Sequence, residues 1–69
     1  MKITAEHKRA FRLAYDALAA AGTPENSTAY FESTAEAMMR VQQKDPESKL
    51  LGHLLSAVYC YLDEVAKKK

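Results

Sequence analysis

The sequence predicts an all-α protein, a small three-helix bundle with helices at about residues 5–21, 24–43 and 46–67. Gly and Pro occur only twice each, and their positions divide the chain into three segments with helix start or stop signals. Apolar residues recur in each segment at spacings of three and four, and no alternating strand pattern is present. A chain of 69 residues holds one small domain, here residues 1–69.

The first helix is expected to begin after Thr4, because a threonine hydroxyl can cap a helix start. Gly22 follows a run of alanines, at the place where a residue in the left-handed conformation often ends a helix. At about 100° per residue, the apolar stripe of this helix contains His7, Phe11, Ala14, Leu18 and Ala21. We therefore expect this stripe to face the core.

The second helix has two candidate starts. Thr23, Pro24 and Glu25 combine a hydroxyl cap, a proline at the first helical position and an acid beside it, which predicts a start at residue 24. Ser27 is a second candidate cap, and it would move the start about one turn later. The apolar stripe contains Ser27, Phe31, Thr34, Ala35, Met38 and Val41.

The third helix carries the strongest apolar pattern. Asp45, Pro46 and Glu47 repeat the same start signal, which predicts a helix from residue 46. Its seam contains Leu51, Leu54, Leu55, Val58, Leu62 and Val65, and apolar flanks widen this face enough for two neighbouring helices. Lysines at positions 67, 68 and 69 suit the negative carbonyl end of the helix. We expect this helix to be the central element.

Short connections predict that consecutive helices are antiparallel neighbours. The alternative is a helical hairpin or bundle that completes its core only as a homodimer. The small size of the chain and the apolar character of the third helix favour this alternative.

Composition argues against several classes of protein. A formal net charge of +1 supplies no large electrostatic field for a phosphate backbone. The longest mostly apolar stretch, Leu50 to Leu62, is shorter than the roughly 20 residues of a membrane-spanning helix. The amino terminus becomes charged where a signal peptide needs its apolar core, and Cys60 has no internal disulfide partner. We therefore expect a cytoplasmic protein that makes no membrane contact.

The sequence offers no set of residues for chemistry. His7, His53 and Cys60 are the only soft or borderline metal ligands, whereas a closed zinc site needs four ligands. His53 and Cys60 are seven residues apart, about 10 Å along one helix, so a single metal ion cannot join them. We expect no metal, no cofactor, no catalytic residue and no enzymatic activity.

The function that remains is a small helical module for protein–protein interaction or regulation, which binds another protein or its own copy. Tyrosine and methionine are favoured in protein contacts, and several lie at the margins of the apolar stripes. A basic cluster on the first helix, Lys8, Arg9 and Arg12, opposes the helix dipole, so local stability does not explain it. The candidate binding residues are Lys8, Arg9, Arg12, Tyr30, Met39, Tyr59 and Tyr61. The alternative function is a nucleic-acid accessory protein that uses this basic cluster, with Lys2, for phosphate contacts.

Overall fold

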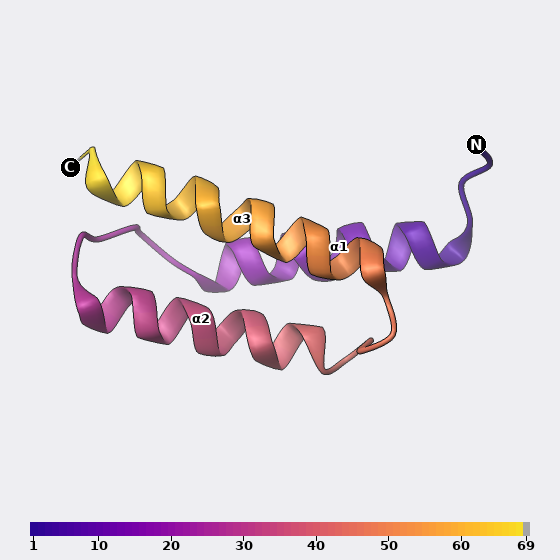
Figure 1. Cartoon of the computed structure of the whole chain (residues 1–69), viewed down its shortest axis with the longest axis horizontal. Helices are drawn as coiled ribbons and strands as arrows, with labels where there is room; N and C mark the ends of the chain where they lie inside the picture. The colour runs from indigo at the N-terminus through magenta and orange to yellow at the C-terminus, as the bar shows by residue number, and fades with distance from the viewer. Residues whose placement is uncertain (69) are drawn as a thin grey trace.

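The computed structural model describes residues 1–68, and this part of the chain contains three α-helices: α1 (Ala5–Ala20), α2 (Thr28–Gln42) and α3 (Lys49–Lys67). Figure 1 shows that α1 and α3 run in the same direction and that α2 runs in the opposite direction. The helix axes follow the long dimension of a 39 × 21 × 16 Å bundle. The predicted all-α three-helix bundle is confirmed, while Lys69, expected beside the last carbonyls, lies outside the described residues.

Two predicted signals delimit α1. The Thr4 hydroxyl accepts a hydrogen bond from the backbone N–H of His7 at 3.4 Å, and the Thr4 N–H donates to His7 Nδ1 at 3.2 Å. This is a reciprocal capping box in which histidine stands where Glu or Gln is usual. Beyond the last turn, Gly22 adopts a φ of +67°, as its predicted role at the helix end requires.

The second helix begins at Thr28, four residues after the predicted start at residue 24. Its cap is the alternative candidate Ser27, whose hydroxyl accepts from the N–H of Tyr30 at 3.1 Å. Asn, Ser and Thr side chains bond to nearby backbone groups in non-helical conformations, so Asn26 and Ser27 favour a cap over a helix interior. Thr23 and Pro24 lie in the connection from α1.

The third helix begins at Lys49, so the predicted start at residue 46 is also wrong. Ser48 is the cap, since its hydroxyl accepts from the N–H of Leu51 at 3.1 Å. The Ser48 N–H in turn donates to the Asp45 carbonyl at 3.1 Å, which closes a four-residue turn with Pro46 at its second position. Asp at the first and Pro at the second position are typical of a β-turn, and the same residues imitate a helix start.

These starts predict unequal effects of two similar substitutions. Ser27→Ala is expected to lower the free energy of unfolding by about 1 kcal/mol, because the Tyr30 N–H loses its partner. Thr23→Ala, in an exposed residue outside the helix, is expected to change it by less than about 0.5 kcal/mol. Urea unfolding followed by circular dichroism measures both. A larger loss for Thr23→Ala than for Ser27→Ala would contradict the start of α2 at Thr28.

The core forms around α3, which lies against both other helices and packs most extensively on α1. Leu51, Leu55 and Leu62 of the predicted seam are buried, and Leu54 and Val58 pack partly buried against them. The whole buried cluster consists of Ala10, Leu13, Ala14, Ala17, Met38, Val41, Leu51, Leu55 and Leu62. The central position expected for the third helix is confirmed.

The first helix is rotated relative to its predicted orientation. Its buried residues are Ala10, Leu13, Ala14 and Ala17, whereas Phe11 and Leu18 of the predicted stripe are 58% and 38% exposed. The distance between packed helices depends on the size of the side chains between them. Alanine on this face lets α1 approach the leucines of α3, which fill the core, whereas a phenylalanine there would hold the two helices apart.

Candidate functional site: a groove between α2 and α3

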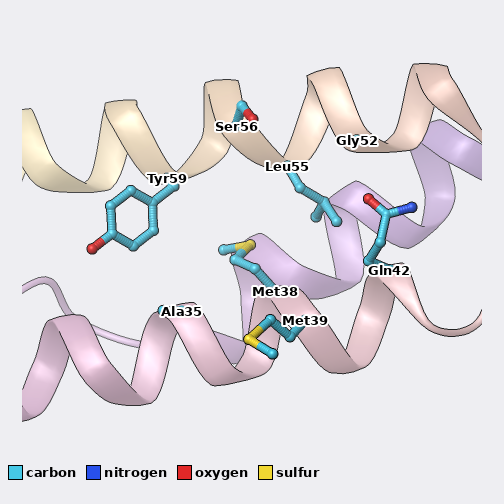
Figure 2. A pocket seen from close by; sticks show the side chains of 8 residues that line it. All are labelled: Ala35, Met38, Met39, Gln42, Gly52, Leu55, Ser56 and Tyr59. Carbon is cyan, nitrogen blue, oxygen red and sulfur yellow. The ribbon is translucent and has the colours of Figure 1, made fainter. Parts of the chain in front are cut away.

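A mostly apolar groove with a volume of about 300 Å³ lies between α2 and α3. Figure 2 shows the eight residues that surround it, four from each helix. Those of α2 are Ala35, Met38, Met39 and Gln42, and those of α3 are Gly52, Leu55, Ser56 and Tyr59. This volume is at the lower end of the range for ligand-binding pockets.

Two methionines shape the α2 side of the groove. Met38 is buried and points toward α3, where it faces Leu55 and forms the floor with it (Figure 2). Met39 follows on the outer wall and is 63% exposed, although it is a large apolar side chain. Methionine is flexible and polarizable, so a wall of this kind can adapt to side chains of different shapes.

Tyr59 closes one end of the groove. Its ring extends from α3 toward α2 (Figure 2) and lies 6.4 Å from the ring of Phe31, measured between centroids. Phe31 in turn makes an edge-to-face contact with Tyr30 at 5.6 Å. The Tyr30 hydroxyl is buried without a hydrogen-bond partner among residues 1–68. Tyr30 is therefore outside the groove lining, and its ring contacts Phe31.

Gly52 and Gln42 form the opposite end. The Gln42 side chain extends toward Gly52 (Figure 2), and its Nε2 donates to the Asp45 carbonyl at 3.3 Å. A β-carbon at position 52 would lie 3.3 Å from Gln42 Oε1, a tight contact. Glycine in the middle of a helix is less favourable than alanine by about 1 kcal/mol. Gly52 therefore lowers the stability of α3 but leaves space beside the groove.

The outer surface of α2 next to the groove lining carries acidic groups. Glu32 and Glu36 lie on the same outer stripe of α2 as Met39, at spacings of four and three. Arg40 pairs with Glu36 at 3.8 Å, and Lys67 of α3 pairs with Asp63 at 3.1 Å. Glu32 has no ion-pair partner within the described residues. The stripe of α2 that contains Met39 therefore also contains one carboxylate without an ion pair among the described residues.

The basic cluster lies on α1, outside the groove, and two of its three side chains form ion pairs within the chain. Arg9 places Nε 3.7 Å from an Asp45 carboxylate oxygen and donates from a terminal nitrogen to the Lys44 carbonyl at 3.1 Å. It thus ties α1 to the connection between α2 and α3. Arg12 pairs with Asp16 one turn along the same helix, also at 3.7 Å.

The two remaining candidates lie outside the groove. Lys8 is exposed and has no ion pair in the part of the chain that the structure describes. Tyr61 is 58% exposed and lies on a different flank of α3 from the groove residues. Of the seven residues predicted for partner binding, the structure brings only Met39 and Tyr59 together in one site. Sequence reasoning missed Gly52, although a glycine within the most apolar helix was a visible signal of close approach.

The three candidate metal ligands, His7, His53 and Cys60, lie at different places in the bundle. His7 is part of the α1 capping box, and both His53 and Cys60 are exposed on α3. Residues 1–68 contain no group of three His, Cys, Asp or Glu side chains that could hold a metal ion. No described helix has the length and apolar character needed to cross a membrane.

The groove offers apolar contact and few polar groups, which suits an apolar side chain better than a polar metabolite. Comparison of the chain with protein-family models, with curated proteins and with solved structures found no match.

Proposed function

We propose that this protein is a small interaction module that binds an amphipathic helix of another protein in the groove between α2 and α3. The partner inserts one or two large apolar side chains between Met39 and Tyr59. A lysine or arginine beside those anchors pairs with Glu32. The observation that carries the proposal is the open, methionine-lined groove, together with Glu32, an acidic group without an ion pair among the described residues, on the same stripe of α2 as Met39.

The dimensions of the groove fit a short stretch of helix. Its α2 wall extends from Ala35 to Gln42, eight residues that span about 10 Å along the helix axis. Two anchors at a spacing of three or four residues are about 5 to 6 Å apart and fit within this length. Recognition through such anchors is the general mode of helix-in-groove binding.

Charge favours a protein partner over a nucleic acid. The outer stripe of α2 that contains Met39 also carries Glu32 and Glu36, which would repel a phosphate backbone. Of the basic residues expected to hold phosphates, Arg9 and Arg12 are held in ion pairs within the chain. These contacts support the protein-binding function against the nucleic-acid alternative. The proposal assigns no catalytic residue and no cofactor.

A cytoplasmic location is part of the same proposal. Cys60 is a free and exposed thiol, and such thiols persist most readily in a reducing compartment.

A panel of synthetic amphipathic helical peptides tests the proposal. Each carries two leucines at a spacing of four residues, and the panel varies the flanking residue between Lys, Ala and Glu. We expect the lysine peptides to shift the methyl signals of Met38 and Met39 and the amide signal of Gly52 in NMR titrations. The expected order of affinity is Lys above Ala above Glu, because only lysine pairs with Glu32. Failure of every peptide to shift these signals would overturn the proposal.

Two variants locate the binding site. Met39→Gln is expected to weaken the tightest peptide about tenfold, since burial of a methionine is worth roughly 1.5 kcal/mol or more. Gly52→Ala narrows one end of the groove and is expected to weaken binding while it stabilises α3. Ser33→Gln, at an exposed position on the same helix but outside the groove lining, is the matched control and should leave binding unchanged. Equal losses for Met39→Gln and Ser33→Gln would place binding elsewhere.

A further inference from the structure

A second apolar surface lies on the other side of α3 and is independent of the groove. On α1, Phe11, Tyr15 and Leu18 follow one another at spacings of four and three, so they form one stripe. On α3, Leu54, Ala57 and Tyr61 do the same at spacings of three and four. Phe11, Tyr15 and Tyr61 are 58%, 68% and 58% exposed. We call these six residues the outer aromatic face.

Contacts within the bundle place both stripes on the same side of the molecule. Arg9 reaches the chain just after α2, so α2 lies on the Arg9 flank of α1. The groove places α2 on the Gly52 and Tyr59 flank of α3. The outer stripes occupy the opposite flank of each helix. Since α1 and α3 pack against each other, these flanks adjoin along one seam that faces away from α2.

The apolar area on this face is large for so small a chain. A fully buried aromatic side chain removes about 150–250 Å² from water, so the exposed parts of the three rings amount to roughly 350 Å² per copy. Two such faces, with Leu18, Leu54 and their polar rims, reach the roughly 1,000 Å² of total area at which specific interfaces begin. Self-association would bury both faces at once.

Charge on α3 favours a second copy in one orientation. Lys49 and Glu64 lie eight and seven residues from Ala57, about 12 and 10 Å along the axis, and neither forms an ion pair within residues 1–68. An antiparallel arrangement that brings Ala57 against its own copy sets Lys49 of each chain beside Glu64 of the other. A parallel arrangement sets like charges together. The small side chain of Ala57 also permits close approach at the crossing point.

We infer that the outer aromatic face binds a second copy of this chain in an antiparallel, two-fold symmetric dimer whose axis passes near Ala57. Such an interface is isologous, so each contact between unlike residues occurs twice. The dimer buries Phe11, Tyr15 and Tyr61 and leaves the groove between α2 and α3 open. It therefore adds a surface that the proposed binding of a partner helix does not use.

Disulfide trapping tests the symmetry axis directly. A cysteine on a two-fold axis can bond to its own copy only where the two Cα atoms approach within about 7 Å. In the Cys60→Ser background, we expect Ala57→Cys treated with oxidised glutathione to give mostly disulfide-linked dimer on a non-reducing gel. Ser33→Cys, at an exposed position on α2, is the matched control and should remain mostly monomeric. Equal dimer yields from the two cysteines would overturn the inference.

Sedimentation of the unmodified chain over a concentration series gives a second readout. We expect a reversible dimer, a shift to monomer in Tyr61→Glu, and at least a threefold weaker association in Lys49→Glu. The double variant Lys49→Glu with Glu64→Lys exchanges the two charges and should restore association. A chain that stays monomeric at millimolar concentration would overturn the inference, as would failure of the double variant to associate better than Lys49→Glu. Tyr61→Glu should still bind the peptides, and Met39→Gln should still dimerise, so the two proposals fail independently.

Discussion

Leu51→Ala is expected to lower the free energy of unfolding by about 3 kcal/mol, because the cavity left behind adds to the lost burial of apolar surface. Leu51 is fully buried, and it is the largest side chain of the described residues with no exposed surface. A domain of this size has a total stability of roughly 3 to 10 kcal/mol, so this loss would leave part of the population unfolded. Urea unfolding followed by helical circular dichroism, at fixed protein concentration, measures the effect.

The preceding residue supplies the control. Leu50 has the same side chain but is only partly buried at the edge of the core. Leu50→Ala is expected to cost about 1 kcal/mol, because less apolar area and a smaller cavity are involved. A greater cost at Leu50 than at Leu51 would contradict the orientation of α3.

Ala17→Leu is expected to destabilise the bundle by about 2 kcal/mol, although it adds apolar surface. Ala17 is fully buried, where added methyl groups would push α1 and α3 apart. Phe11→Ser removes a large apolar side chain but is expected to cost less than about 1 kcal/mol, because the ring is more than half exposed. Both are measured by urea unfolding in the Tyr61→Glu background, which removes the proposed self-association from the comparison.

Together, the variants Ala17→Leu and Phe11→Ser test the rotation of α1. If the predicted stripe of Phe11 and Leu18 faced the core, Phe11→Ser would cost about 3 to 5 kcal/mol and Ala17→Leu almost nothing. Such a reversal would contradict the buried alanine face of α1.

The number of helices and the face that α3 buries could be predicted from sequence because several signals agree. Leucines at spacings of three and four fix the buried face of α3. Thr4 and Gly22 mark the ends of α1 as expected. The starts of α2 and α3 were predicted too early because proline follows a capping residue in both places. Pro24 and Pro46 lie in connections, and the serines nearer each helix supply the hydroxyl that accepts a free N–H of the first turn.

The rotation of α1 could not be predicted from the periodicity of apolar residues. Such a pattern gives the most weight to the largest side chains, so it places Phe11 and Leu18 in the core. The buried alanines carry little apolar surface individually, but they allow the backbones of α1 and α3 to approach each other. Either the burial of Phe11 and Leu18 or the close approach of the helices can be more favourable, and the outcome depends on how much of the core the leucines of α3 already fill. That is a property of the assembled bundle.

The candidate site was predicted in part. Met39 and Tyr59 were singled out by residue type at the margins of their helices, and the structure places both on one groove. The other groove residues depend on which flank of α3 meets α2, and the sequence does not specify this pairing. The same pairing separates the two proposed binding surfaces, since α3 contributes one flank to the groove and the opposite flank to the outer aromatic face.

The buried alanine face of α1 is the central claim, because it positions the outer aromatic face and sets the packing of the core. One carbon-edited NOE spectrum of the unmodified protein tests it most directly. We predict cross-peaks that join the methyl groups of Ala10 and Ala17 to leucine methyl groups of α3. Cross-peaks between the ring of Phe11 and the methyl groups of Met38 or Val41 in the core would contradict it.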